Sequence, residues 1–278
     1  MSAFNIYTST EHMNNSASLD CAIILTLEGS ERTPQAVRRS EAFSSLVSKV
    51  VIQTNPGYKN IKKPLPVETA EADCGFCHYG ACKYSLENGF ENVLVLEDDF
   101  IVEDEYYEHE DAIREDIIDF LEKSEIDHYF LGCTPFLAIP WSFSCGGTWR
   151  VIRGGTAHAV IHSKKGMKKI VNDWEKDPNK ILPVDLYMFR NRSFMHARPL
   201  VCQTFPETEN KLKNWGSDAT ISGMVSNIFI GAVGLDLTTQ PGYDIMYGTA
   251  KSIPIILFIV CVSLVIFLII KKKKAKKK

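Results

Sequence analysis

The sequence predicts an α/β fold with a mostly parallel central sheet, followed by one C-terminal transmembrane helix. Two observations predict the sheet: short apolar runs of strand length recur through the first 215 residues, and segments with helical spacing separate them. One observation predicts the membrane helix: residues 253–270 are apolar apart from Pro254 and Ser263. That stretch is close to the roughly 20 residues that a helix needs to cross a bilayer.

The individual elements follow from local patterns. We expect strands, or short segments that complete the core, at residues 21–27, 47–53, 93–96, 128–131, 156–161, 183–189 and 199–204. We expect helices after the turn at residues 29–34 and at residues 78–88, 111–124 and 164–174. Gly89 should close the helix before it, and Ser163 should cap the helix after it. Residues 54–73 and 132–155 are rich in helix and strand breakers, so both are expected to be irregular.

The chain divides by composition into five parts. They are a polar leader (1–19), one α/β domain (20–215), the domain edge and connector (216–252), the transmembrane helix (253–270) and a basic tail (271–278). The leader has neither the basic nor the apolar region of a signal peptide, which favours a body in the cytosol. The lysine tail, by the positive-inside rule, instead favours a lumenal body. The sequence therefore predicts a single-pass membrane protein and leaves the side of the membrane open.

The charge is distributed unevenly. The chain has a formal net charge of −3, and its last eight residues, KKKKAKKK, carry seven lysines. Removing those seven charges leaves −10 for residues 1–270. A nucleic-acid-binding body would be basic, so we expect no nucleic acid partner. The bilayer is a predicted partner. The lysine tail either lies against its anionic lipid headgroups or is a plain stop-transfer flank.

One acidic stretch stands out as a candidate site. Four apolar residues, Val93 to Leu96, read as a buried strand, and Glu97, Asp98 and Asp99 follow where that strand leaves the sheet. Ligands of open α/β sheets bind at the carboxyl ends of strands, and hard divalent cations prefer oxygen ligands. A metal-phosphate site fits this pattern, and a solvated acidic turn fits it equally well.

Several ordered segments resemble glycosyltransferase family 25, which includes lipooligosaccharide and collagen galactosyltransferases. Leu96-Glu-Asp-Asp-Phe100 resembles its L-E-D-D motif, and the segment from Cys77-His78 to Gly89 resembles its Ser-His helix with Cys77 in place of Ser. Residues 155–166 resemble its G-T-x-x-Y segment, with Ala159 where an aromatic residue is common. Pro183-Val-Asp185 resembles its P-x-D segment, and Pro199 to Gln203 its last strand.

The resemblance implies a GT-A-like nucleotide-sugar-binding domain. Such a domain would transfer a hexose, such as galactose or glucose, from a nucleotide-sugar donor to a glycan or protein acceptor with inversion. The departing diphosphate needs a divalent cation, here Mn²⁺ or Mg²⁺. Glu97 and Asp99 are the expected metal-binding pair, because residues two apart on an extended strand point the same way. Asp98 would point elsewhere, toward the ribose of the donor or a basic residue. If the alternation fails at the turn, the roles of the three carboxylates exchange.

Three further residues receive roles from the resemblance, each with a plainer alternative. Asp185 is the candidate general base, and it would equally serve as an ordinary helix N-cap. His158 is a candidate third metal ligand or donor contact, or a structural histidine. Arg32 follows the first strand and is a candidate nucleotide contact, or a surface arginine in a turn.

Two other readings of the chain remain open. A non-catalytic membrane protein that retains the fold fits the replacements at Cys77 and Ala159, and a Mg²⁺ phosphotransferase or nuclease would use the same carboxylates. Residues 74–78 also match the C-x-x-C-H pattern of haem attachment, which nothing else in the sequence supports. Cys74, Cys77, His78 and Cys82 have the ligand types of a zinc site, but their spacing fits no standard motif, and buried cysteines are the alternative.

Overall fold

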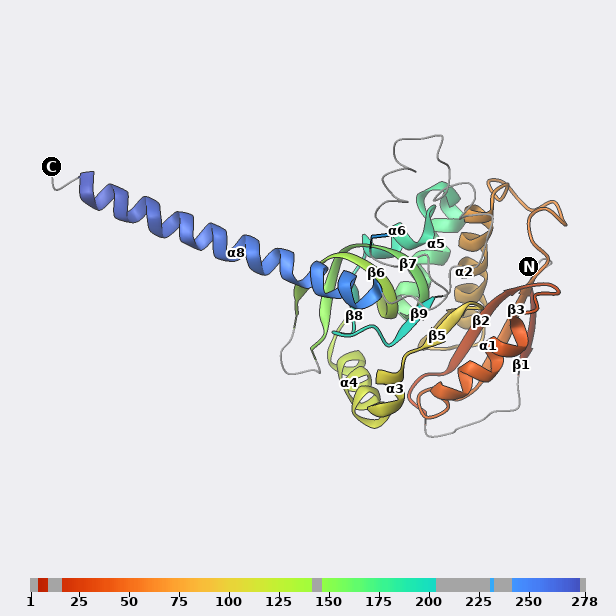
Figure 1. Cartoon of the computed structure of the whole chain (residues 1–278). Helices are drawn as coiled ribbons and strands as arrows, with labels where there is room; N and C mark the ends of the chain where they lie inside the picture. The colour runs from red at the N-terminus through yellow and green to blue at the C-terminus, as the bar shows by residue number, and fades with distance from the viewer. Residues whose placement is uncertain (1–4, 10–16, 142–146, 204–230, 233–241, 276–278) are drawn as a thin grey trace.

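The computed structural model describes residues 5–9, 17–141, 147–203, 231–232 and 242–275, which form an α/β domain and a long projecting helix (Figure 1). The strands are β1 (Ile6–Ser9), β2 (Cys21–Leu27), β3 (Val50–Asn55), β4 (Asn92–Glu97), β5 (Phe100–Val102), β6 (His128–Pro140), β7 (Trp149–Ser163), β8 (Ser193–Met195) and β9 (Val201–Gln203). The helices are α1 (Thr33–Ser40), η1 (Glu41–Phe43), α2 (Ala70–Glu87), α3 (Asp104–Glu108), α4 (Glu110–Lys123), α5 (Lys164–Lys176), η2 (Pro178–Lys180), α6 (Val184–Phe189) and α8 (Gly242–Ala275).

The central sheet has the strand order β1-β3-β2-β4-β7-β6-β8. β2 pairs in parallel with both β3 and β4, and β6 pairs in parallel with β8. β7 runs antiparallel to β4 and β6, and β1 runs antiparallel to β3. All strands of this sheet except β1 and β7 therefore point the same way, which confirms the predicted α/β fold with a mostly parallel sheet. A separate antiparallel pair joins β5 to β9.

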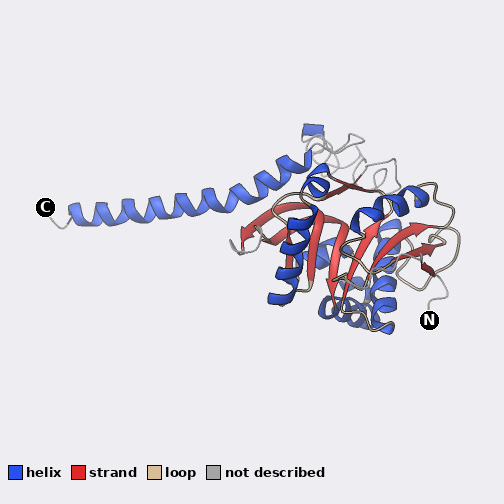
Figure 2. Cartoon of the chain, turned by 90° about the horizontal axis from the view of Figure 1, so that it is seen from below, coloured by secondary structure: helices blue, strands red, loops and turns tan. Residues whose placement is uncertain are grey.

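Helices cover both faces of the sheet (Figure 2). The alternation along β4 shows why, because Val93 and Val95 pack into the core under α2 and α5, whereas Leu94 and Leu96 pack into the core under α1 and α4. A strand buried on both faces has to be apolar throughout, and this explains the uninterrupted run that predicts it.

Residues 132–155 were expected to be irregular, and that expectation is wrong for most of the segment. β6 and β7 form a long hairpin that continues well beyond the predicted strands. The register shifts between Phe130 and Gly132, and again between Pro135 and Leu137. Such bulges let a strand carry proline and glycine without losing its pairing.

The structure has one strand that was not expected and one helix that begins earlier than expected. Residues 6–9 of the polar leader form the edge strand β1. α2 begins at Ala70, where the Thr69 hydroxyl accepts a hydrogen bond from the Ala72 N–H at 3.1 Å and caps the helix. Cys74 and His78 lie on the face of this helix that is turned toward Glu97 at the end of β4.

The helix α8 is partly docked and partly exposed. Near its start, Met246, Tyr247 and Ala250 are buried against the domain, and the Lys251 ammonium donates to the Ala197 carbonyl at 2.6 Å. The following apolar side chains, from Ile253 to Ile270, are exposed as the helix projects from the domain (Figure 1). By length and composition, Asp244–Lys272 is long and apolar enough to cross a membrane. Most of the expected connector at residues 216–252 lies outside the described residues.

Candidate functional site

The acidic stretch lies at the carboxyl end of β4, next to the end of its parallel neighbour β2. Leu25 of β2 pairs with Glu97, so β2 and its following turn extend past the carboxylates. The alternation of β4 continues through its last residue, which places Glu97 on the side of α2. Asp98 lies on the opposite side, toward the start of α1. The three adjacent carboxylates therefore meet different neighbours.

Asp98 is fully engaged by the turn after β2. The Arg32 guanidinium lies 3.0 Å from its Oδ1, and the hydroxyls of Thr26 and Ser30 donate to its Oδ2 at 2.8 and 2.9 Å. The Asp98 side chain is 7% exposed, whereas that of Arg32 is 37% exposed. Buried charges are stable only when they are paired and hydrogen-bonded, and Asp98 meets both conditions. This carboxylate holds the turn and Arg32 in place at the edge of the site.

Glu97 and Asp99 converge on one amide. The Gln203 Nε2, at the end of β9, donates to Glu97 Oε2 at 3.3 Å and to Asp99 Oδ2 at 3.0 Å. The Arg32 guanidinium approaches the same Asp99 oxygen at 3.7 Å. An oxygen of each carboxylate thus points toward one small region, as the ligands of a hard divalent cation do. That either residue binds metal stays a prediction.

The two carboxylates differ in their electrostatics. Burial, followed by the negative charge of Glu97, raises the pKa of Asp99 to about 7, although Gln203 and Arg32 oppose the rise. Burial also acts to raise the pKa of Glu97, but the contacts with His78, His158 and Cys74 outweigh it and hold that pKa below its usual range. The pair therefore carries negative charge that its protein neighbours do not fully compensate. A bound cation would supply this compensation, so the residues present fit a divalent metal.

His158 is a residue of β7, the strand next to β4, and it is fully buried. Its Nε2 donates to the Val201 carbonyl at 3.1 Å. Burial lowers the pKa of His158 to about 4, so the imidazole is neutral at physiological pH. The structure places this side chain near Glu97 but inside the core, which supports a structural contribution to the site.

Asp185 lies in the first turn of α6, where Pro183 is the N-cap residue. Its Oδ2 accepts a hydrogen bond from the Thr156 N–H at 3.0 Å, and its Oδ1 accepts one from the Leu186 N–H at 2.8 Å. Thr156 has a φ of 54°, in the left-handed region that residues with a Cβ rarely adopt. This strained backbone aims its N–H at the carboxylate and fixes it. The alternative role of Asp185 as a helix N-cap is therefore wrong. The N-cap residue is Pro183, and Asp185 binds backbone N–H groups from within the first turn.

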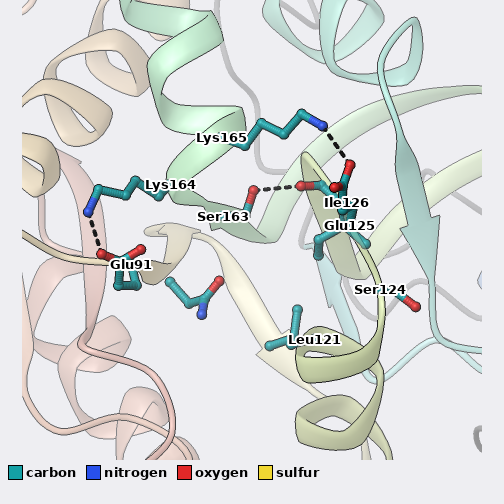
Figure 3. A pocket seen from close by; sticks show the side chains of 9 residues that line it. Glu91, Leu121, Ser124, Glu125, Ile126, Ser163, Lys164 and Lys165 are labelled. Carbon is teal, nitrogen blue, oxygen red and sulfur yellow. Dashed lines mark hydrogen bonds and ion pairs between the residues drawn. The ribbon is translucent and has the colours of Figure 1, made fainter.

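One surface cavity of the described residues lies elsewhere. It has a volume of about 270 Å³ and lies at the amino end of β4, away from the carboxylates (Figure 3). Lys164 pairs with Glu91 across it, and the Lys165 ammonium lies 3.0 Å from Glu125. These four charges satisfy one another, so the cavity offers no recognisable ligand chemistry.

Two parts of the site do not follow from the sequence. Gln203 carries no chemical motif, and only its position at the end of a short strand marks it. The sequence groups Cys74 and His78 as possible zinc ligands, but it does not join them to Glu97, which lies beside both on the α2 side. Of the four zinc ligands considered from the sequence, Cys77 and Cys82 are buried outside this cluster, as the alternative of buried cysteines expects, and the Cys77 sulfur accepts a hydrogen bond from the Asn55 amide.

Comparison with known proteins adds little. No protein-family model matches the chain, and no curated protein matches it. The chain is similar to the solved structure of A197 from STIV. The match covers 64% of this chain and 81% of that one, with 13% identity and a TM-score of 0.34. It is also similar to the structure of a glycosyltransferase involved in the glycosylation of the major capsid of PBCV-1. That match covers 63% of this chain and 81% of the other, with 12% identity and a TM-score of 0.32. At these scores neither structure carries an argument about the function of this chain.

Proposed function

We propose that the protein is a glycosyltransferase that moves a hexose from a nucleotide-sugar to a hydroxyl of a glycan or protein. The observation that carries the proposal is the convergence of Glu97 Oε2 and Asp99 Oδ2 on one amide nitrogen at the end of a parallel strand. The resemblance of the surrounding segments to glycosyltransferase family 25 supports the same assignment. The partly uncompensated charge of the pair supports a need for a cation.

Glu97 and Asp99 would hold Mn²⁺ or Mg²⁺, which neutralises charge on a departing diphosphate when bound. Arg32 is kept at the edge of the site by Asp98, and its exposed guanidinium is suited to bind a phosphate oxygen of the donor. Gln203 holds the two carboxylates together and orients them. Each of these residues binds or orients the donor end of the reaction.

Asp185 is the proposed general base for the acceptor hydroxyl. Its two backbone hydrogen bonds fix the carboxylate, and a fixed base needs little reorganisation to accept a proton. Inversion requires that this proton leave the acceptor as the sugar transfers to it in one step. Thr156, by its unusual backbone, would therefore contribute to the position of the base.

We propose that α8 anchors the enzyme in a membrane by a single pass. Met246 and Tyr247 are buried against the domain, and the Lys251 ammonium donates to the Ala197 carbonyl, so the start of the anchor is held directly on the domain. Protease protection of the domain in sealed vesicles would assign the side.

The decisive experiment is a donor screen with the full chain in detergent. A panel of sugar nucleotides is incubated with Mn²⁺ or with a chelator, and binding and hydrolysis of each donor are measured. We expect one donor to be used only with metal, and Asp99→Asn to lower the rate by about 100-fold or more. Asp119→Asn, the same change on the surface of α4, is the control.

Three outcomes would contradict the proposal. A well-folded chain that binds no sugar nucleotide with metal would indicate a non-catalytic protein with this fold. Product release from a nucleoside triphosphate or a nucleic acid would indicate a phosphotransferase or nuclease instead. Unchanged donor hydrolysis in Asp99→Asn would remove the carboxylate pair from the mechanism.

A further inference from the structure

The wall of the site formed by α2 carries a second set of donor atoms, of a different chemical kind. Ligand atoms of Cys74, His78 and Glu97 all lie within 4.8 Å of one another. The Cys74 Sγ is 3.6 Å from Glu97 Oε1, and the His78 Nε2 is 3.7 Å from the same oxygen. The other oxygen of Glu97, Oε2, faces Gln203 and Asp99. Glu97 therefore separates a sulfur–nitrogen side from an all-oxygen side.

The His78–Glu97 separation fits a shared metal better than a hydrogen bond, whereas the Cys74–Glu97 separation fits either a metal or a hydrogen bond from the thiol. A charge-assisted N–H···O bond is about 2.7–2.9 Å long, so 3.7 Å between His78 and Glu97 is too long for one. Zinc bonds of about 2.0 Å to nitrogen and oxygen and about 2.3 Å to sulfur, at tetrahedral angles, place neighbouring ligands about 3.3–3.5 Å apart. The two separations from Glu97, 3.6 Å to the sulfur and 3.7 Å to the nitrogen, lie within a few tenths of an ångström of that spacing.

The burial of His78 is an independent indication. Its side chain is fully buried, and neither ring nitrogen has a hydrogen-bond partner within the described part of the chain. A buried polar group without a partner costs about 1–3 kcal/mol, so such groups usually have a reason to exist. A metal on Nε2 would satisfy one of the two nitrogens.

The placement follows from two regular elements. Cys74 and His78 are four residues apart on α2 and so share one face of the helix. Glu97 is on the α2 side of β4 because it continues the alternation of Val93 and Val95. Cys74 is half-buried and gives access from solvent, whereas Cys82, two turns further along, is buried in the core away from the cluster.

We propose that Cys74, His78 and Glu97 form a zinc-binding site, with the fourth coordination position open to water. A thiolate and an imidazole select zinc over manganese or magnesium, which prefer oxygen. Zinc replaces the proton of the Cys74 thiol, and that proton passes to solvent. The site does not need the proposed glycosyl transfer, although Glu97 would couple the two metals if both bind.

The test uses the metal-free full chain in detergent and reads the metal itself. One equivalent of Co²⁺, the spectroscopic substitute for zinc, should produce thiolate-to-cobalt absorption and the intense visible bands of a four-coordinate ion. Zinc should then abolish both signals. Cys74→Ala should remove the thiolate absorption and weaken zinc binding by about 100-fold or more. Loss of a residue that only hydrogen-bonds to a ligand costs up to about 100-fold, and loss of a direct ligand should cost at least as much.

Cys82→Ala is the matched control, because it makes the same change on the same helix outside the cluster. It should keep both the absorption and the zinc affinity. The proposal is overturned if the wild-type chain shows no thiolate–cobalt absorption, or if Cys74→Ala retains wild-type zinc affinity. Sugar-nucleotide binding with Mn²⁺ is measured on the same samples, so a zinc signal without donor binding would refute only the proposed function.

Discussion

Three neutral histidines in the core make acid stability a direct test of the structure. His128, His158 and His162 are fully buried. Burial is the main reason that the pKa of His128 falls to about 3 and that of His158 to about 4, and it holds the pKa of His162 well below its usual value. In the unfolded chain each has a pKa of about 6.5. Unfolding therefore takes up protons below that pH.

The magnitude follows from counting those protons at pH 5.5. Each unfolded histidine binds about 0.9 proton there and each folded one almost none, so the three contribute about 2.7 protons. Asp99 acts in the opposite direction, because its folded pKa of about 7 keeps it protonated when the unfolded carboxyl is ionised. The difference for these four groups is about two protons, and buried His196, whose pKa is also lowered by burial, acts in the same direction as the other histidines. Stability should fall by about 2–3 kcal/mol for each unit that the pH drops between 6 and 5.

The sign is opposite for the two kinds of group, and this makes the prediction specific. A lowered histidine pKa gives stability that is present above pH 6.5 and lost as the pH falls toward the folded pKa. A raised carboxyl pKa gives stability that is present below the unfolded value and lost as the pH rises toward about 7. His128→Asn should therefore flatten the dependence by about 1.2 kcal/mol per pH unit, and Asp99→Asn should steepen it by about 1.3.

The assay is urea unfolding of the full chain in detergent, followed by tryptophan fluorescence, at several pH values from 5 to 6 with a chelator present. The slope of unfolding free energy against pH is compared, so a variant that is less stable overall remains informative. His109→Asn, at an exposed position, is the control and should leave the slope unchanged. A wild-type slope near zero, or equal slopes in His128→Asn and Asp99→Asn, would refute the placement of these groups.

Two further predictions concern packing and buried charge. Gly132→Ala would place a Cβ 2.0 Å from the Val201 carbonyl oxygen, so we expect a loss of about 3 kcal/mol or more, whereas Gly248→Ala in α8 meets no atom within 4 Å and should gain up to about 1 kcal/mol. Urea midpoints of the two variants give the comparison, and similar midpoints would be inconsistent with the close approach. The Lys63 ammonium lies 2.5 Å from Asp73 with its side chain fully buried, so Lys63→Ala should cost about 3–5 kcal/mol. Adding Asp73→Asn should recover part of that loss, and a double variant whose losses simply add would contradict the pairing.

Sequence patterns predict the fold where local and tertiary requirements agree. Val93 to Leu96 is apolar because both faces of β4 are covered, and the same run marks the strand in the sequence. The hairpin of β6 and β7 is different, because Pro135 and Gly154 are breakers by local preference. Gly154 is instead required by tertiary contact, since a Cβ there would lie 2.9 Å from the Phe189 ring. No local rule separates such a glycine from one in a loop.

The same contrast applies to the site. The period of two along a strand predicts that Glu97 and Asp99 share a side and that Asp98 does not, and the structure has this arrangement. What the period cannot predict is the partner of each group, because Gln203 is more than a hundred residues away along the chain.

Those partners decide how the three carboxylates divide their work. Asp98 receives one guanidinium and two hydroxyls, so its charge is neutralised and its lone pairs are used. A cation would have to displace these contacts to bind it. Asp99 accepts a hydrogen bond from the Gln203 amide, and the Arg32 guanidinium lies 3.7 Å from the same oxygen. Burial and then the charge of Glu97 raise the pKa of Asp99 to about 7. A cation therefore gains most between Glu97 and Asp99, where it relieves repulsion that the protein leaves in place, and the middle carboxylate of the motif serves the loop that carries Arg32.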